Sequence, residues 1–432
     1  MGDRRVAYCD AMSDELSSAE FPSPGIPLAV ASEVGGLREV IAHRPGLELE
    51  RLTPTNKDAF LFDEVLWVSQ ARSEHAAFVA ALREAGVIVH LFDRLLQETV
   101  AVPEARDFIL DAVFDERVYG PMAVEAVREV FAGMDDATLT RHLIGGLSKR
   151  ELLRLAPEPP SIPIRTMALD DFVVTPLPNH LFSRDASAWI YDGLAINSMR
   201  KHARIRETIN YEAIYHWHPR FAAHRFARWS HGSLDGIATT EGGDIFVLGN
   251  GAVMVGMSER TTPSGLERLA SRLFAAGTVT RIVAIELPHR RSFMHLDTVI
   301  SMVDEETFTK FAGMGMLPAY TIRPGAGDDH LSITAHPPED MHKVMASALG
   351  LDDIRILTAT QDVYAAAREQ WDDGLNVLAI APGVVVAYER NVTINAHLQE
   401  NGIDVITVPG TELGRGRGGP RCMTCPISRA PV

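Results

Sequence analysis

The feature of this sequence that most restricts its fold is a recurring junction of a helical segment, a glycine and a strand. In the first case the apolar spacing of residues 63–85 predicts a helix that stops at Gly86 and runs into a strand at 87–91. Glycine in this position is typical of a left-handed helix cap. The same order returns at 266–276, Gly277 and 281–287; at 339–349, Gly350 and 354–357; and at 391–401, Gly402 and 403–408.

Apolar runs joined by tight turns recur as well, and they predict β-hairpins. Each predicted hairpin is followed by a polar corner and a helix, so one supersecondary unit is used several times. About five such units are expected, which favours a radial or stacked α/β architecture over a doubly wound sheet. The clearest hairpins span 188–197 around Asp192-Gly193, 245–256 around Gly249-Asn250-Gly251, and 377–388 around Pro382-Gly383.

Residues 95–160 break this pattern, because they carry helical stretches and no strand signal. We interpret them as an inserted all-helical subdomain that ends in a proline-rich exit. Residues 28–94 and 161–432 then form the α/β body, and the polar, Pro/Ser-rich residues 1–27 form a flexible extension. Helices in the insert are expected at 103–117, 121–134, 136–144 and 148–155.

The composition excludes several classes of protein. With 41 Lys and Arg against 57 Asp and Glu, the formal net charge is −16, which disfavours nucleic acid or an anionic membrane as a partner and mildly favours a cationic ligand. No apolar run approaches the roughly 18 residues of a membrane span, and residues 1–25 lack the apolar core of a signal peptide. Three cysteines give no disulfide framework. We therefore expect a cytoplasmic protein.

Two of the three cysteines lie in the glycine-rich stretch RGRGGPRCMTCP, residues 415–426. Glycines let a backbone approach a ligand closely, and neighbouring arginines are expected to lower the pKa of a thiol, so Cys422 or Cys425 is a candidate nucleophile. The C-x-x-C spacing also fits a zinc half-site or a redox pair. Two observations disfavour the zinc and redox interpretations. The only other cysteine, Cys9, is far away in the sequence, and Pro426 follows Cys425 directly. An inert structural loop is the other alternative.

Polar side chains interrupt the hydrophobic pattern in three further stretches: PNHLFSRD at 178–185, EGGD at 241–244 and MHLD at 294–297. In a strand, the spacing of His295 and Asp297 would send both side chains to one face. Taken singly, EGGD could be a plain turn, the histidine of MHLD could be a hydrogen-bonded core residue, and the Arg-Asp pair of PNHLFSRD could be a surface ion pair. Together they border strand ends of the repeated unit, where a pseudo-symmetric fold would gather them around its axis.

A cysteine, a histidine and carboxylates indicate acyl or amidine transfer through a covalent intermediate. Several convergent acids would oppose the oxyanion of an acyl transfer, whereas they match the fixed N–H groups of a guanidinium. Arginines elsewhere in the site, notably Arg204 and Arg260, would then hold a carboxylate on the same ligand. The pattern predicts a pocket for free arginine.

In this order, PNHLFSRD, EGGD, MHLD and GRGGPRCMTCP resemble bacterial arginine deiminase, a cytosolic member of the guanidine-modifying (amidinotransferase) superfamily that converts L-arginine and water to L-citrulline and ammonia in arginine catabolism. The opening SEVGGLREVIAHRPG and the later LFDE are also similar, so the resemblance runs from about Ser32 onward and includes the helical insert. It implies a five-bladed pseudo-symmetric α/β propeller, no metal or organic cofactor, and a homo-oligomer, either dimer or tetramer.

The resemblance also implies a role for each matching residue. Cys422 would attack the guanidinium carbon to give a covalent thiouronium, and Cys425 would be only a neighbour. His295 would carry protons, kept charged by Glu241. Asp185 and Asp297 would grip the guanidinium. The implied substrate-binding residues are Arg204 and Arg260 for the carboxylate, Asn179 and Phe182 along the pocket, Asp244 close by, and Arg417 as a gate of the empty site.

Three alternatives stay open at this point. The protein could be another guanidine hydrolase, acting on agmatine or methylated arginine, although agmatine has no carboxylate for Arg204 and Arg260. It could be a non-catalytic arginine-binding protein, for which a nucleophile such as Cys422 has no use. It could also bind a metal through its C-x-x-C. Arg421 places a fixed charge beside the nucleophile, which is expected to affect the working pH.

Overall fold

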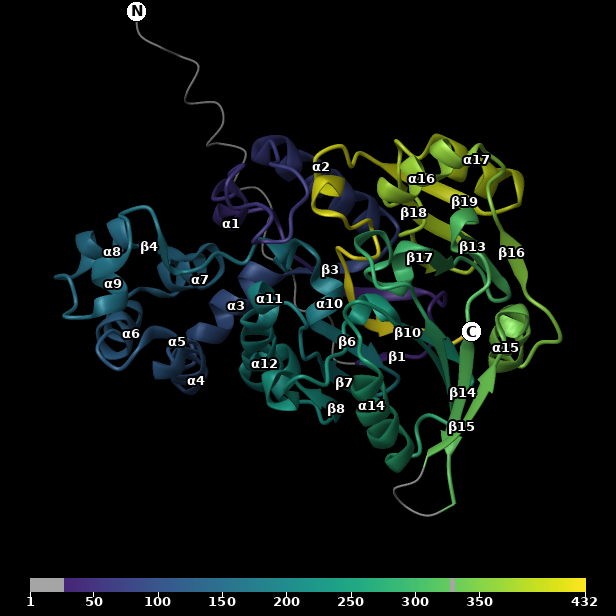
Figure 1. Ribbon diagram of the computed structural model, residues 1–432, viewed down its shortest axis with the longest axis horizontal. Helices are drawn as coiled ribbons and strands as arrows, with labels where there is room; N and C mark the ends of the chain where they lie inside the picture. Colours follow the sequence, from purple (N-terminus) through teal and green to yellow (C-terminus); the bar gives the residue numbers. More distant parts are fainter. Residues whose placement is uncertain (1–26, 327–330) are drawn as a thin grey trace, which may run out of the picture.

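The computed structural model describes residues 27–326 and 331–432 as a mixed α/β protein (Figure 1). The predicted flexible extension, apart from residue 27, lies outside these described residues. Three-stranded units in the body share one connectivity, in which two antiparallel strands are followed by a third that pairs in parallel with the second. The first unit consists of β6 (Ser187–Ile190), β7 (Gly193–Ile196) and β8 (Ala227–His231).

The same connectivity occurs in three further sheets of the described chain. The helix α14 (Pro263–Ala275) crosses between strands two and three of the second sheet, and α17 (Val392–Glu400) does so in the fourth. These sheets contain β9 (Ile245–Gly249), β10 (Ala252–Met257) and β11 (Arg281–Glu286); β12 (Ile300–Met302), β13 (Thr307–Lys310) and β16 (Arg355–Leu357); and β17 (Leu378–Ala381), β18 (Val384–Tyr388) and β19 (Asp404–Val408). The second sheet continues into the hairpin β14 (Ala319–Pro324) and β15 (Leu331–His336).

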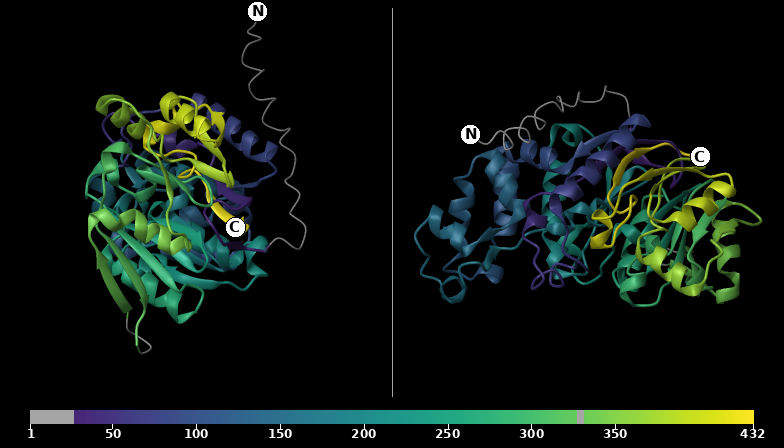
Figure 2. Two further views of the ribbon diagram at one scale, coloured as in Figure 1. Left: turned by 90° about the vertical axis from the view of Figure 1, so that its right-hand side faces the viewer. Right: turned by 90° about the horizontal axis from the view of Figure 1, so that it is seen from above.

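A fifth sheet joins segments from the two ends of the described chain. The strand β20 (Cys425–Arg429) pairs antiparallel with β2 (Leu37–Ala42), and β2 pairs in parallel with β3 (Ile88–Leu91). This repeats the connectivity of the other units. The short β1 (Ala29–Val30) adds to the other edge of β20, with Ala29 opposite Ser428. In Figure 2 the yellow β20 lies beside the purple β2.

The glycine junctions predicted from the sequence are confirmed. Gly350 caps α15 (Met341–Leu349) with φ 80° and ψ 22°, and Gly402 follows α17 with φ 83°. An L-side chain rarely adopts this backbone conformation. The helix α2 (Val68–Glu84) starts later than the predicted residue 63, so that prediction was wrong at its start. Asp63 lies in a loop and forms an ion pair with Arg291 instead, with an N–O distance of 2.9 Å.

Residues 92–155 are mainly helical and project from one side of the body, as Figures 1 and 2 show. The expectation of no strand in 95–160 was wrong, because the two-residue strand β4 (Leu147–Ser148) pairs with β5 (Phe172–Val174). Leu147 and Val174 face each other there and are buried. A continuous apolar core joins these helices to the body. They are α3 (Phe92–Val100), α4 (Pro103–Val113), α5 (Glu116–Tyr119), α6 (Val124–Ala132), α7 (Asp136–Gly145) and α8 (Lys149–Leu155).

Of the remaining helices of the described chain, α9 (Ile162–Thr166) lies beside α6 and α8 in the projecting helical region (Figure 1), and α1 (Leu47–Glu50) packs against α7. None of the described helices is both long and apolar enough to span a lipid bilayer. The others are α10 (Ser183–Ala186), α11 (His202–Ile205), α12 (Glu207–Trp217), α13 (Pro219–Ala222) and α16 (Val363–Trp371).

Candidate active site

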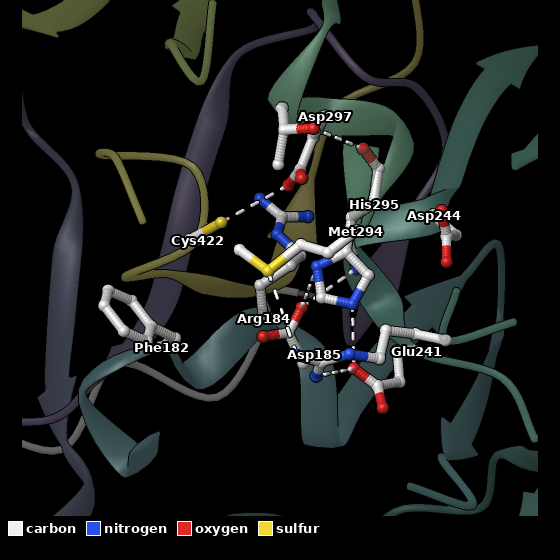
Figure 3. Close-up of polar contacts among 12 residues, drawn as sticks. Phe182, Arg184, Asp185, Glu241, Asp244, Met294, His295, Asp297 and Cys422 are labelled. Atoms are coloured by element: carbon white, nitrogen blue, oxygen red, sulfur yellow. Dashed lines mark hydrogen bonds and ion pairs between the residues drawn. The ribbon is translucent and has the colours of Figure 1, made fainter. Parts of the chain in front are cut away.

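The segments that precede the first strand of each unit meet at one place, and Figure 3 shows the side chains they contribute. Asp185 comes from α10, just before β6, and Glu241 comes from the turn before β9. Asp297 comes from the turn before β12, and Cys422 precedes β20. A small cavity of about 10 Å³ is lined by Asp185, His295 and Cys422 among others. The structure thus brings together residues from widely separated motifs.

The EGGD glycines let two of these segments touch. A Cβ on Gly242 would lie 2.0 Å from the carbonyl oxygen of Arg184, and one on Gly243 would lie 2.8 Å from the His295 ring. Either separation is shorter than a packed Cβ tolerates, so larger residues would push the segments apart. The glycines of this motif therefore serve close approach around the histidine.

His295 lies between carboxylates. Its Nε2 is 2.7 Å from Glu241 Oε2, and its Nδ1 is 3.7 Å from Asp185 Oδ1. Burial by itself would lower the pKa of His295, but the charge of Asp185, the hydrogen bond to Glu241 and the charge of Asp244 outweigh it and raise the pKa to about 9. Arg260 and His295 together lower the pKa of Glu241 despite its burial. At neutral pH the histidine is therefore an imidazolium.

His295 and Asp297 do not lie in a strand, the case in which their spacing would put both side chains on one face. Leu296–Thr298 form a 3-10 turn, and His295 is the residue before it. Asp244 causes this geometry, because its Oδ1 accepts a hydrogen bond from the Leu296 N–H at 2.8 Å. The alternation of apolar and polar residues in MHLD therefore reflects a turn held by a buried acid.

Asp297 and Cys422 are direct neighbours. The Cys422 thiol donates to Asp297 Oδ2 at an S–O distance of 3.6 Å, and Arg421 Nη1 is 2.7 Å from the same oxygen. Burial raises the pKa of the Cys422 thiol well above its ordinary value, and the charges of Asp297 and Asp185 add to this, while Arg421 acts against it. Arg421 lowers this pKa, as the sequence led us to expect, but burial and the acids outweigh it, so the net shift is upward.

Cys425 does not reach the cavity. Its Sγ donates to the Ser187 carbonyl oxygen at 3.3 Å, and the side chain is fully buried below β6. Of the two candidate nucleophiles, only Cys422 lines the cavity.

The predicted substrate-binding arginines differ in how far they are already engaged. Arg204 binds Asp185 at 2.5 Å and Glu207 at 2.9 Å, and it also donates to backbone carbonyls. Arg260 pairs with Glu241 at 3.3 Å, while its Nε has no hydrogen-bond partner among the described residues. Arg260 therefore has more donors left for an anionic group than Arg204 has.

The other predicted residues fall into two sets. Asn179, Phe182 and Arg417 line the cavity. Asp244 is buried behind it, where Ser258 and the Leu296 N–H occupy its carboxylate, and burial raises its pKa to about 7. Asp244 therefore supports the His295 turn and does not border the cavity.

Arg417 is buried, has φ 67°, and lies over the ring of Trp371 with its guanidinium carbon 3.6 Å from the ring centroid. None of its guanidinium nitrogens has a hydrogen-bond partner among the residues described. Burial raises the pKa of the nearby Asp373 to about 7, which Arg417 opposes. Sequence reasoning missed Trp371 and Asp373, and it also missed Arg291, Met294 and Asn376. Asn376 alone had a usable signal, because its segment precedes the hairpin of β17 and β18.

Three side chains of the site lie close enough together to hold a metal ion. The ligand atoms of Asp185, Glu241 and His295 lie within 4.8 Å of one another. The raised pKa of His295 keeps its imidazole protonated at neutral pH, and a protonated imidazole does not bind a metal. The donor set therefore fits a proton-transfer group better than a metal ligand.

The structure is a mixed α/β fold that gathers a buried cysteine, a charged histidine and several carboxylates, and similar folds occur among solved structures. The chain is similar in structure to SxtG, an amidinotransferase from Microseira wollei in saxitoxin biosynthesis, with a TM-score of 0.55, 15% identity, and coverage of 94% of this chain and 98% of that one. Residues 58–429 match the family model for arginine deiminase. The chain belongs to the arginine deiminase family, which supports a hydrolase that acts on amidine groups.

A second group of similar structures comes from cyanobacteria. The product-bound N-terminal domain of ArgZ, an arginine dihydrolase from the ornithine–ammonia cycle, has a TM-score of 0.52 and 11% identity, over 90% of this chain and 97% of that domain. Full-length ArgZ matches with a TM-score of 0.50 and 11% identity over 92% of this chain, which spans 40% of it. At these identities the likeness shows a shared fold.

Proposed function

We propose that this protein hydrolyses free L-arginine to L-citrulline and ammonia through a covalent S-amidino intermediate on Cys422. One observation carries the proposal: the Cys422 Sγ lies 3.6 Å from Asp297 Oδ2 and borders the same cavity as His295. Family membership supports it, as does the arginine dihydrolase activity named for the ArgZ domain. Arginine catabolism is the corresponding role.

The carboxylates supply the selectivity for a guanidinium. Asp185 and Asp297 are both buried and lie on opposite sides of Met294 (Figure 3), and of the two only Asp185 lines the cavity. Each holds one intramolecular arginine, Arg204 and Arg421 respectively, which demonstrates that its oxygens accept guanidinium N–H groups. A substrate guanidinium between them places its central carbon near the Cys422 Sγ.

The substrate also activates the nucleophile. In the empty site, burial and the acids favour the neutral thiol of Cys422. A cationic guanidinium reverses the sign of the local field and lowers the thiol pKa when it binds. The thiol then releases its proton to solvent, so the thiolate forms where its target is already oriented.

His295 moves the protons of both half-reactions. The Cys422 thiolate attacks the guanidinium carbon to form a C–S bond, the C–N bond to a terminal nitrogen breaks, and the imidazolium gives its proton to the departing ammonia. The neutral imidazole then takes a proton from water, whose oxygen attacks the same carbon. The C–S bond breaks, citrulline leaves, and the thiol is regenerated. Glu241 stabilises the imidazolium at 2.7 Å.

The far end of arginine needs a cationic contact for its carboxylate. Arg260 has free donors for this role, and Arg204 contributes at most the N–H groups that its internal partners leave unused. Asn179 and Phe182 line the passage between the two ends, and Arg417 gates it. No step uses a metal or an organic cofactor.

The same proposal includes the wider organisation. The five sheets of shared connectivity act as five blades of an α/β propeller around the site, formed by residues 28–94 and 161–432, and residues 95–160 form an insert. The enzyme works in the cytoplasm as a homo-oligomer, a dimer or a tetramer.

A direct assay tests the activity. Purified protein is incubated with L-arginine, and citrulline and ammonia are measured, with agmatine and a methylated arginine as competing substrates. We expect citrulline and ammonia in equal amounts, none with Cys422→Ala, and most of the activity with the matched Cys425→Ala. Arginine binding without citrulline would instead identify a non-catalytic binding protein, and a preference for agmatine would remove the role of Arg260.

A further inference from the structure

One of the five units has not yet been assigned a residue at the candidate active site. Asp185, Glu241, Asp297 and Cys422 each lie just before the first strand of a unit. The remaining unit begins at β17 (Leu378–Ala381). If the units share a common layout, the residues just before β17 face the same region as the other segments.

Asn376 occupies that position and is fully buried. Its Oδ1 accepts a hydrogen bond from the Cys422 backbone N–H at 2.9 Å, and its Nδ2 donates to the Asp297 carbonyl oxygen at 3.1 Å. One partner is a pure donor and the other a pure acceptor, so only one orientation of the amide satisfies both. Its own carbonyl accepts from the Arg421 N–H at 3.4 Å.

Asn376 therefore joins two segments that are far apart in the sequence. In the described chain it is the one hydrogen-bond acceptor for the Cys422 N–H. The glycine-rich segment packs directly against it, because a Cβ on Gly419 would lie 2.6 Å from the Asn376 carbonyl oxygen. Only a glycine at position 419 therefore leaves room for the Asn376 carbonyl oxygen.

We propose that Asn376 is a positioning residue, which fixes the Cys422 nucleophile relative to Asp297. Through its two amide contacts it sets the position of the Sγ beside the carboxylate, at 3.6 Å. Misplacement of a reacting atom by about 1 Å costs on the order of 100-fold in rate. The turnover part of the proposal rests on the proposed function, whereas the position of the thiol does not.

Two variants separate the two contacts. Asn376→Ala removes both, and Asn376→Asp keeps the acceptor for the Cys422 N–H, loses the donor to Asp297 and adds a negative charge. The matched control is Asn395→Ala in α17, since Asn395 is also buried and donates to one backbone carbonyl, that of Tyr388, at 3.0 Å. The control is expected to keep wild-type turnover.

The first measurement needs no substrate. Each protein is treated with iodoacetamide from pH 6 to 10, and modification of Cys422 is followed by peptide mass spectrometry. We expect Asn376→Ala to free the loop and speed alkylation of this buried thiol by about 10-fold. Asn376→Asp adds a negative charge beside a thiol whose pKa is already raised, and it is expected to slow alkylation by about 10-fold across this pH range. Alkylation rates within two-fold of the control for both variants overturn the proposal.

The second measurement is steady-state turnover of L-arginine. Both Asn376 variants are expected to lose about 100-fold in kcat with KM within about three-fold of the wild type. A raised KM at unchanged kcat would mean that Asn376 binds substrate and would contradict a positioning role. If the wild type produces no citrulline, the proposed function fails, and the alkylation profiles alone still decide the role of Asn376.

Discussion

Replacing Glu241 by glutamine tests the electrostatics of the site directly. The pKa of His295 is raised from an ordinary value near 6.5 to about 9, which corresponds to roughly 3 kcal/mol in favour of the imidazolium. Asp185, Glu241 and Asp244 supply this stabilisation of the imidazolium and outweigh the opposing effect of burial. Of the three, Glu241 forms a hydrogen bond with His295, at 2.7 Å. Loss of one charged hydrogen bond is worth about 1.5 kcal/mol, so Glu241→Gln should lower the His295 pKa to roughly 8.

The titration can be followed by NMR with ¹³C-labelled histidine. The chain has 16 histidines, and a His295→Gln spectrum identifies the resonance that belongs to His295. Glu212→Gln is the control, because Glu212 pairs with Arg228 away from the site. Turnover gives a second readout: the rate should fall at alkaline pH as His295 loses its proton, and this fall should occur about one pH unit lower in Glu241→Gln. A His295 that titrates near 6.5 in the native protein, or that ignores the substitution, would refute this reasoning.

Three further substitutions test other contacts of the site. The folded-state pKa of Asp373 is raised to about 7. The native state therefore binds more protons than the unfolded chain between about pH 4 and 7, and it loses stability as the pH rises through this range. In urea unfolding, Asp373→Asn should be more stable than the wild type by about 1–3 kcal/mol at pH 8 and little changed at pH 4. Trp371→Leu removes the 3.6 Å contact with Arg417 and should lower the free energy of unfolding by about 1–2 kcal/mol. Trp371→Phe keeps an aromatic ring and should have a stability between those of Trp371→Leu and the wild type. Equal stability of the two variants would contradict this. Gly419→Ala forces a methyl against Asn376 and should cost about 1–3 kcal/mol in thermal unfolding, and an unchanged Tm would show that the loop yields freely.

Much of the architecture was visible in the sequence, because turn and cap residues act locally. Gly350 and Gly402 end helices where the pattern indicated, and the hairpin around Asn250 forms as expected. The site motifs were also visible, since buried polar residues such as Glu241 and Asp297 interrupt apolar patterning. The structure brings them together because each precedes a strand of the repeated unit.

Other properties could not be read from the sequence. The thiol pKa of Cys422 is a sum over acids from several segments, and the sequence shows only its arginine neighbours. The turn at His295 is decided by Asp244, which lies about 50 residues earlier. Asn376 was marked only by its place before a predicted hairpin, since a single asparagine before a strand is otherwise an ordinary turn residue. Each of these depends on contacts distant in sequence.

The sheet that contains β20 has a consequence for how the enzyme gains and loses activity. Its strands β2 and β20 pair Ile41 with Cys425, a contact with one of the largest sequence separations in the chain. Closing so long a loop costs conformational entropy before the contact rewards it. Cys422 lies three residues before this strand, so the candidate active site is complete only when β2 and β20 pair, and mild denaturant that frays this pairing should abolish any turnover while most of the helical signal persists.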